Sequence, residues 1–197
     1  MGATISQLWT PPTIAVGVVS IPSAGKTAII RKLSGGQDPI PPLNESSIAC
    51  PNLISRYADT GIAVNNTIFT VKGQEYNVLD YSSDRRIRGV WRKLLFRMRA
   101  IIFIIDSTDK ENMDDARDAL WEVLYEEQLD PRPILILANK QDNPKAMSVS
   151  ELIKYLKIEE DLAKTRECRI MPSSAFDDKS LEEGLEWLRE IVRTNPY

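Results

Sequence analysis

The sequence predicts an α/β fold, in which six strands form a mostly parallel sheet with helices on both faces. Three continuous apolar runs, 14–19, 100–105 and 134–138, are typical of strands that are covered on both sides. Helical patterns separate these runs, and such alternation along one chain favours a parallel sheet. Two further strands are separated only by Lys72-Gly73, which predicts an antiparallel hairpin. The six predicted strands are 14–19, 64–71, 74–79, 100–105, 134–138 and 168–171.

The helices are predicted from the spacing of apolar residues and from capping residues. Ser148 and Ser180 each stand three residues before a glutamate, which is the capping-box pattern at the start of a helix. The polar, proline-rich stretch 34–59 has no periodicity, and we expect either a functional loop or a disordered insertion there. The predicted helices are 27–33, 113–124, one that begins at Ser148 and one that begins at Ser180.

Composition narrows the possible functions. The chain has 197 residues, and this length predicts one domain, 13–195, after a short N-terminal segment, 1–12. It has no His and a net charge of −3. The absence of His excludes Ser-His-Asp and Cys-His catalysis and metal sites that need imidazole. The negative charge argues against a nucleic-acid partner. Cys50 and Cys168 form no disulfide framework and are typical of a reducing cytosol.

A candidate phosphate-binding loop follows the first strand, as Ser20-Ile21-Pro22-Ser23-Ala24-Gly25-Lys26-Thr27. Backbone N–H groups at the start of a helix can bind an anion, and Lys26 would reach the β- and γ-phosphates. The Thr27 hydroxyl would coordinate Mg²⁺. The pattern normally begins with Gly, where this chain has Ser20, and the alternative is a chance Gly-Lys-Thr at a helix start. The predicted phosphate-binding residues are Ser23, Ala24, Gly25, Lys26, Thr27 and Ala28.

A second candidate turn, Asn139-Lys140-Gln141-Asp142, directly follows the predicted strand 134–138. Guanine presents two adjacent donors, the ring N–H and the exocyclic amine, and the Asp142 carboxylate can accept both. Asn139 would link the base to the phosphate loop, and the Lys140 stem would lie along the base. Alone the tetrapeptide is a polar turn, but after a strand and downstream of the phosphate loop it predicts a site for GTP or GDP.

With these motifs the chain resembles the ADP-ribosylation factor and factor-like family of small GTPases, over about residues 14–192. The resemblance implies the P-loop small GTPase fold, with Asp80 and Thr60 as further Mg²⁺ ligands and Asp59 as an alternative to Thr60. It also implies that Ser174-Ala175 contacts the guanine oxygen. The matching motifs are Ala24-Gly25-Lys26-Thr27, Ile87-Arg88 with Trp91-Arg92, Asp106-Ser107-x-Asp109, Ala138-Asn139-Lys140-Gln141-Asp142 and Glu183-Gly184-Leu185-Glu186-Trp187-Leu188.

The chain departs from the family where the catalytic residues are expected. The family usually has Gly-Gly-Gln or a close variant after the strand-end Asp, and here Ser82-Ser83-Asp84 stands there. Ser83 replaces the glycine whose amide meets the γ-phosphate. Asp84 replaces the glutamine that orients the attacking water, and a carboxylate cannot donate a hydrogen bond to the transition state. We therefore predict nucleotide binding with weak or absent GTP hydrolysis.

A cationic run lies in the segment 58–99, through which the resemblance implies binding of an exchange factor, a GTPase-activating protein and effectors. One interpretation is a solvated helix face, and the other is a docking patch for an acidic partner or anionic lipid. The family uses three aromatic positions for a contact that spans its two switch segments, and this chain keeps them only in part. Trp91 remains, whereas Leu79 and Leu94 are aliphatic. The cations are Arg85, Arg86, Arg88, Arg92, Lys93, Arg97 and Arg99.

The N-terminus fits an N-myristoylation pattern, with Gly2 followed by Ser at position 6. Ile5, Leu8 and Trp9 share one helical face and would add to membrane binding, because one acyl chain alone binds only marginally. Alternatively, Leu8 and Trp9 pack on the core. The resemblance further implies that a nucleotide-dependent shift of the hairpin expels this segment.

Together these features and the resemblance predict a monomeric, ADP-ribosylation-factor-like GTP-binding switch. It would recruit effectors in vesicle or ciliary traffic. It would be cytoplasmic and reversibly bound to the Golgi, endomembranes or the ciliary base. The alternative is a nucleotide-locked or nucleotide-free pseudo-GTPase that acts as an interaction scaffold. A P-loop kinase is disfavoured because 139–142 selects guanine.

Overall fold

The computed structural model describes residues 12–36, 64–129, 132–158 and 166–195, and within them six strands form a single sheet in the order β2-β3-β1-β4-β5-β6. Among these described strands only β2 and β3 pair antiparallel, and the other four pairings are parallel, as predicted. The strands are β1 (Ile14–Ser20), β2 (Val64–Val71), β3 (Gln74–Tyr81), β4 (Ala100–Asp106), β5 (Ile134–Asn139) and β6 (Cys168–Pro172).

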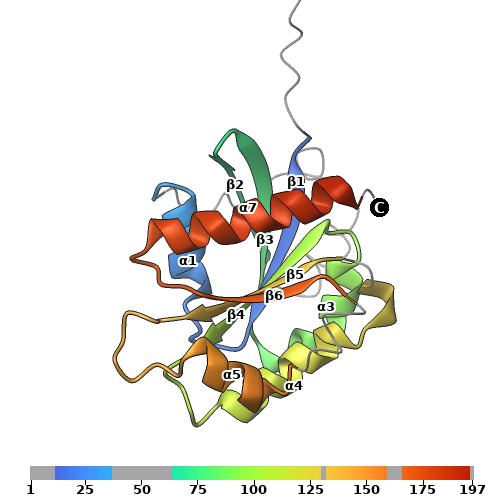
Figure 1. The fold of residues 1–197 in the computed structure, drawn as a ribbon. Coiled ribbons are helices and arrows are strands. Elements are labelled where there is room, and N and C mark those ends of the chain that lie inside the picture. Colours follow the sequence, from blue (N-terminus) through green and yellow to red (C-terminus); the bar gives the residue numbers. More distant parts are fainter. Residues whose placement is uncertain (1–11, 37–63, 130–131, 159–165, 196–197) are drawn as a thin grey trace, which may run out of the picture.

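Helices cover both faces of this sheet, with α1 and α7 on one side and α3, α4 and α5 on the other (Figure 1). Every residue of β1, β4 and β5 is buried, because each of these central strands contacts helices on both sides. Among the described residues the helices are α1 (Lys26–Leu33), α3 (Arg88–Leu95), α4 (Met113–Leu124), α5 (Val149–Leu156) and α7 (Asp178–Thr194), with 3₁₀ turns η1 (Arg85–Ile87) and η2 (Glu127–Leu129). None of the helices in these ranges is long and apolar enough to cross a membrane.

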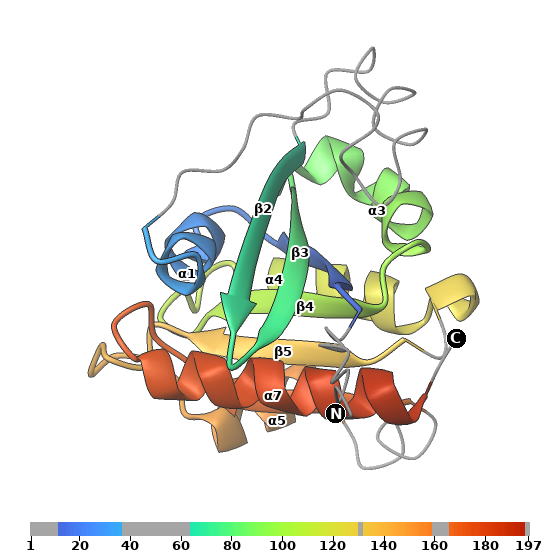
Figure 2. The same ribbon diagram turned by 90° about the horizontal axis from the view of Figure 1, so that it is seen from above.

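The strand register brings the candidate turns to one edge of the sheet. Val18 of β1 is level with Asp80 of β3, and Asp106 of β4 is level with Asn139 of β5. Because these strands run parallel, their following loops all leave from the same edge (Figure 2). In open α/β sheets this carboxyl edge is where ligands bind.

The helix caps confirm one sequence prediction and correct another. Ser148 caps α5 in a full capping box, since its hydroxyl accepts from the Glu151 N–H and the Glu151 carboxylate accepts from the Ser148 N–H. Ser180, in contrast, does not open a helix. It lies inside α7, which is capped by the Asp177 carboxylate accepting from the Lys179 N–H. The prediction failed because an aspartate three residues earlier supplies an equally good cap.

Helix α3 was not among the elements predicted from apolar spacing, because its sequence is dominated by cations. Its buried side includes Trp91, Leu94 and Leu95, which pack in the core between α3, α4 and the sheet. Arg88 is also buried and donates two hydrogen bonds to the Asp115 carboxylate of α4, at 2.7 and 2.5 Å. These hydrogen bonds raise the pKa of Arg88 and lower that of Asp115, so both groups stay charged.

Replacing Arg88 with Met is expected to lower the free energy of unfolding by about 2–3 kcal/mol, because Asp115 then loses its partner. The effect stays below that of a fully buried pair, since the Asp115 side chain is 30% exposed. Thermal unfolding should show a fall in Tm of about 4–12 °C. Arg92→Met, on the exposed side of the same helix, is the control and should change Tm by less than about 2 °C. Equal falls for both variants would contradict the assignment.

Candidate functional site

The loop between β1 and α1 has the backbone of an anion-binding turn. Ser23 and Gly25 have φ of +65° and +87°, and a residue of positive φ next to one of negative φ turns consecutive backbone N–H groups toward a common centre. The first helical hydrogen bond of α1 runs from the Ile29 N–H to the Gly25 carbonyl. The amides of residues 26–28 therefore precede the helical pattern and can serve a ligand.

Gly25 is required here for two separate reasons. Its φ of +87° disfavours any side chain, and an added Cβ would lie 2.5 Å from Nδ2 of Asn139. That nitrogen donates to the Ala24 carbonyl at 2.8 Å, so the buried Asn139 side chain ties the turn after β5 to the phosphate loop. The predicted link between the two turns is thus present in the structure. Asn139 Oδ1 is buried and accepts no hydrogen bond from the described residues.

Gly25→Ala is expected to lower the free energy of unfolding by about 2–4 kcal/mol, since backbone strain and the clash with Asn139 add together. Gly35→Ala is a matched control, because Gly35 also has a positive φ, +68°, but apart from its chain neighbours no atom of the described residues lies within 4 Å of an added Cβ. The control should lose only about 1 kcal/mol. Chemical denaturation of both variants measures the difference, and equal losses would show that the close approach to Asn139 is unimportant.

Lys26 and Asp80 form an ion pair beside this loop, and both side chains are nearly buried, at 11% and 5% exposed. Burial lowers the pKa of the Lys26 ammonium to about 8, and the neighbouring Asp80 carboxylate favours the charged form. Thr27 and Ala28 stand exposed in the first turn of α1. A hydroxyl at a helix start near a strand-end carboxylate provides the hard oxygen ligands that Mg²⁺ prefers. The described residues therefore fit a magnesium ion bound together with phosphate.

The turn after β5 lies against the loop after β6. Ser174 Oγ donates to Oδ1 of Asp142 at 2.6 Å, and the Gln141 N–H donates to the Ser173 carbonyl at 3.1 Å. The Asp142 carboxylate is exposed and can accept further hydrogen bonds. Ala175 follows in the same loop and is half-buried. The structure thus brings together Asp142, Ser174 and Ala175, which the sequence predicted as base contacts.

Lys140 reaches across to β4, where its Nζ lies 2.5 Å from Oδ2 of Asp106. Asp106 also accepts from the Thr108 backbone N–H and hydroxyl, at 2.9 and 2.6 Å. Burial raises the pKa of Asp106, but the hydrogen bonds from Lys140 and Thr108 outweigh it and lower the pKa overall. Asp106 was noted in the sequence as part of a motif but was not predicted as a site residue. The sequence signal that could have found it is its position directly after the apolar run 100–105, just as Asn139 directly follows the run 134–138.

The residues at the expected catalytic position form contacts of their own. The Asp84 carboxylate caps η1 and accepts from the Arg86 backbone N–H at 2.9 Å and from its guanidinium at 2.5 Å. These hydrogen bonds from Arg86 lower the pKa of Asp84 to about 2. Ser83 Oγ lies 3.0 Å from Ser20 Oγ. The sequence did not predict either partner. The Ser20 contact joins residues 63 positions apart, whereas the Arg86 contact is local and depends on the conformation of the turn at η1.

Several predicted residues lie outside the described ranges. These are Gly2, Ile5, Leu8, Trp9, Cys50, Asp59 and Thr60. The third Mg²⁺ ligand and the N-terminal membrane contact therefore stay predictions.

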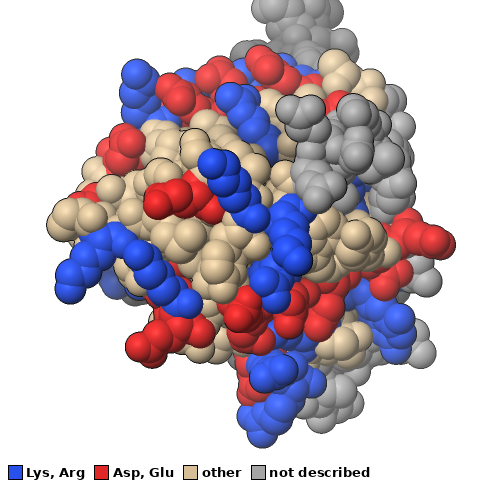
Figure 3. All heavy atoms as spheres, turned by 60° about the horizontal axis from the view of Figure 1, so that its bottom comes forward, with Lys and Arg blue, Asp and Glu red and all other residues tan. Residues whose placement is uncertain are grey.

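The cationic run does not form one uniform patch. Arg88 is buried against Asp115, Arg86 binds Asp84, and Arg99 donates to the Val192 carbonyl at 3.3 Å. The exposed remainder is Arg85, Arg92, Lys93 and Arg97. On the face at the bottom of Figure 1, acidic and basic side chains lie next to one another (Figure 3). Because Arg88, Arg86 and Arg99 already have protein partners, the run favours the interpretation of a solvated helix face over an extended docking patch for anions.

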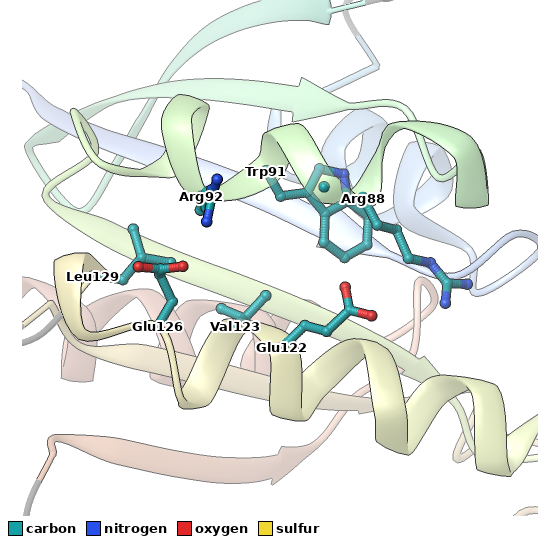
Figure 4. A pocket seen from close by; sticks show the side chains of 8 residues that line it. Arg88, Trp91, Arg92, Glu122, Val123, Glu126 and Leu129 are labelled. Atoms are coloured by element: carbon teal, nitrogen blue, oxygen red, sulfur yellow. The ribbon is translucent and has the colours of Figure 1, made fainter.

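A cavity of about 370 Å³ lies between α3 and the end of α4. The Trp91 ring points from α3 toward α4, with Val123 and Leu129 on the opposite wall (Figure 4). Arg92 lies on the α3 side and Glu122 on the α4 side, so the rim carries both signs of charge. A cavity of this size can accept an apolar side chain from a partner.

The fold and the arrangement of these turns define a P-loop small GTPase. The chain is similar to a solved structure described as the Arl6 BBS3 small GTPase from Trypanosoma brucei with bound nucleotide analogue GppNp, with a TM-score of 0.71 and 22% identity over 93% of this chain and 99% of that one. The sequence model of the ADP-ribosylation factor family matches residues 54–192, more than half of the chain. The chain belongs to this family, which confirms the resemblance inferred from the motifs.

Two curated relatives are similar over nearly the whole chain. ADP-ribosylation factor-like protein 1 of Saccharomyces cerevisiae is 31% identical over 95% of this chain and 92% of its own length. ADP-ribosylation factor-like protein 2 of Arabidopsis thaliana is 30% identical over 91% of this chain and 88% of its own length. The match therefore extends well beyond the isolated motifs.

Proposed function

We propose that this protein binds GTP and GDP with Mg²⁺ as an ADP-ribosylation-factor-like switch protein. The observation that carries the proposal is the hydrogen bond from Asn139 to the Ala24 carbonyl, which joins the phosphate turn and the base turn into one site. One end of the site offers backbone amides and Lys26, and the other offers Asp142. The nucleotide contacts would be Ser23, Ala24, Gly25, Lys26, Thr27, Ala28, Thr60, Ser83, Asn139, Lys140, Asp142, Ser174 and Ala175.

Magnesium, when bound, would neutralise charge on the β- and γ-phosphates. Thr27 and Asp80 would hold the ion, with Thr60 as a further ligand. Lys26 and Asp80 form an ion pair with each other in the structure. If a ligand binds one of the two side chains, the other loses its partner and needs a new one. Lys26 would pair with the phosphates, and Asp80 would pair with the cation. Nucleotide and Mg²⁺ should therefore bind cooperatively, because either one alone leaves a buried charge unpaired.

The first test is the identity of the bound nucleotide. Nucleotide extracted from purified protein should be GDP or GTP, and titration with Mg²⁺ should show affinity for both, with ADP and ATP as controls. Binding of GDP and GTP well above that of the adenine nucleotides supports the switch. Failure to bind any guanine nucleotide at any Mg²⁺ concentration would leave the scaffold alternative.

Hydrolysis is proposed to be weak, because Asp84 is ionised and has no proton to donate to the transition state. The Ser83→Gly, Asp84→Gln variant is expected to hydrolyse GTP at least tenfold faster than the native protein in single-turnover assays. Asp84→Asn is the control for charge alone, since it removes the carboxylate without restoring the longer glutamine. A native rate equal to that of the double variant would overturn this part of the proposal.

Membrane and partner binding complete the proposal. Acylation at Gly2, supported by Ile5, Leu8 and Trp9, would hold the protein reversibly on a Golgi, endomembrane or ciliary-base membrane. Exchange factor, GTPase-activating protein and effectors would bind through 58–99, and the cavity beside Trp91 and Arg92 would receive a partner side chain. Intact-mass analysis after co-expression with an N-myristoyltransferase tests the anchor, and an unmodified Gly2 would exclude it.

A further inference from the structure

Two serines that replace pattern glycines lie against each other. Ser20 ends β1 where a phosphate loop normally begins with Gly, and Ser83 stands where the γ-phosphate-sensing glycine is expected. Their hydroxyl oxygens are 3.0 Å apart, although the residues are 63 positions apart in the chain. Glycine at either position would remove this hydrogen bond. The two departures from the pattern are therefore linked, because both serines are needed for this one hydrogen bond.

Ser20 provides a rigid anchor for this bond. It is 1% exposed and lies in the central strand β1, level with Ile104 of β4. Ser83, in contrast, belongs to the short segment 82–84 between β3 and η1, which forms no strand or helix. The bond thus attaches a connecting segment to the most buried part of the sheet.

A second contact holds the same segment from the other side. The indole N–H of the buried Trp91 donates to the Ser82 carbonyl at 3.3 Å, and the Asp84 N–H donates to Ser82 Oγ at 3.3 Å. Protein groups on β1 and on α3 therefore fix the position of 82–84 together.

We propose that the Ser20–Ser83 hydrogen bond is a specificity-determining contact that holds the γ-phosphate-sensing segment in its docked position in both nucleotide states. This inference rests on the proposed binding of GTP and GDP. A ligand binds more weakly when the protein conformation that it needs is only partly populated. Keeping the segment docked therefore raises the affinity for GTP relative to the affinity for GDP. GDP has no γ-phosphate for the Ser83 amide to meet, so its affinity should not depend on the bond.

The test is a double-mutant cycle of Ser20→Ala, Ser83→Ala and the two combined. Each variant is expected to lose about 2- to 12-fold in affinity for a non-hydrolysable GTP analogue, with GDP affinity unchanged. The double variant should lose no more than either single variant, because one bond is removed in all three. Ser34→Ala, at another buried serine hydroxyl beyond the end of α1, is the control and should change neither affinity.

Hydrogen exchange of amides 82–87 in the GDP-bound protein supplies an independent readout. The three variants should exchange faster than the native protein by the same factor. Loss of analogue affinity in Ser83→Ala alone would mean that its hydroxyl meets the phosphate directly, and would overturn the inference. Additive losses, or native exchange in every variant, would also overturn it. Native protein that binds neither nucleotide would instead overturn the proposed function itself.

Discussion

Asp142→Asn is expected to weaken GDP binding at least a hundredfold and to give a protein that prefers xanthosine diphosphate. The Asp142 carboxylate can accept from both the ring N–H and the exocyclic amine of guanine. An amide accepts only one of these bonds and presents its own NH₂ to the guanine amine, so two donors face each other. Each hydrogen bond to a charged group contributes about 1.5–3 kcal/mol, and a factor of ten corresponds to about 1.4 kcal/mol.

Xanthine has a carbonyl where guanine has the amine, so the NH₂ of the new amide gains an acceptor. Competition between GDP and xanthosine diphosphate for a fluorescent nucleotide measures the change. Ser174→Ala is the matched control, because it keeps the carboxylate and removes only the 2.6 Å bond that positions it. That variant should lose about 2- to 12-fold in GDP affinity and keep guanine preference. Unchanged selectivity in Asp142→Asn would mean that this turn does not contact the base.

The sequence was sufficient to place both candidate turns at one edge of the sheet. Continuous apolar runs mark the buried strands β1, β4 and β5, and the residues directly after parallel strands must leave from the same edge. The link from Asn139 to the phosphate loop followed from this placement. The placement of the turns could be predicted because it depends only on the direction of the strands, and the Asn139 side chain then needs to span only the gap between two neighbouring turns.

The unpredicted features depend on contacts between distant segments. Helix α3 is rich in cations, and its apolar stripe is short, so apolar spacing alone gave no clear helix. The pairs Ser20–Ser83 and Arg88–Asp115 join residues that are 63 and 27 positions apart. A single sequence gives the identity of such residues but not the rotamers and the packing that bring their polar atoms together.

Lys26→Met is expected to reduce affinity for GDP and GTP by about 30- to 4,000-fold. The Lys26 side chain is nearly buried beside the phosphate loop, so its charge is poorly screened by water. Loss of one member of a buried, hydrogen-bonded charge pair costs about 2–5 kcal/mol in binding. Methionine keeps the length and the apolar stem, so the change reports the ammonium. Native-like affinity in this variant would exclude the loop as the phosphate site.

The same substitution has a second effect that must be separated from the first. Without Lys26, the Asp80 carboxylate is 5% exposed and has lost its ion-pair partner, so the free energy of unfolding should fall by about 3–5 kcal/mol. Adding Asp80→Asn removes the isolated charge and should restore most of that stability, as measured by chemical denaturation. It should not restore nucleotide affinity, because bound phosphates would still lack the ammonium and a bound magnesium ion would lack a carboxylate. A double variant that regained both stability and affinity would show that Lys26 acts only in folding.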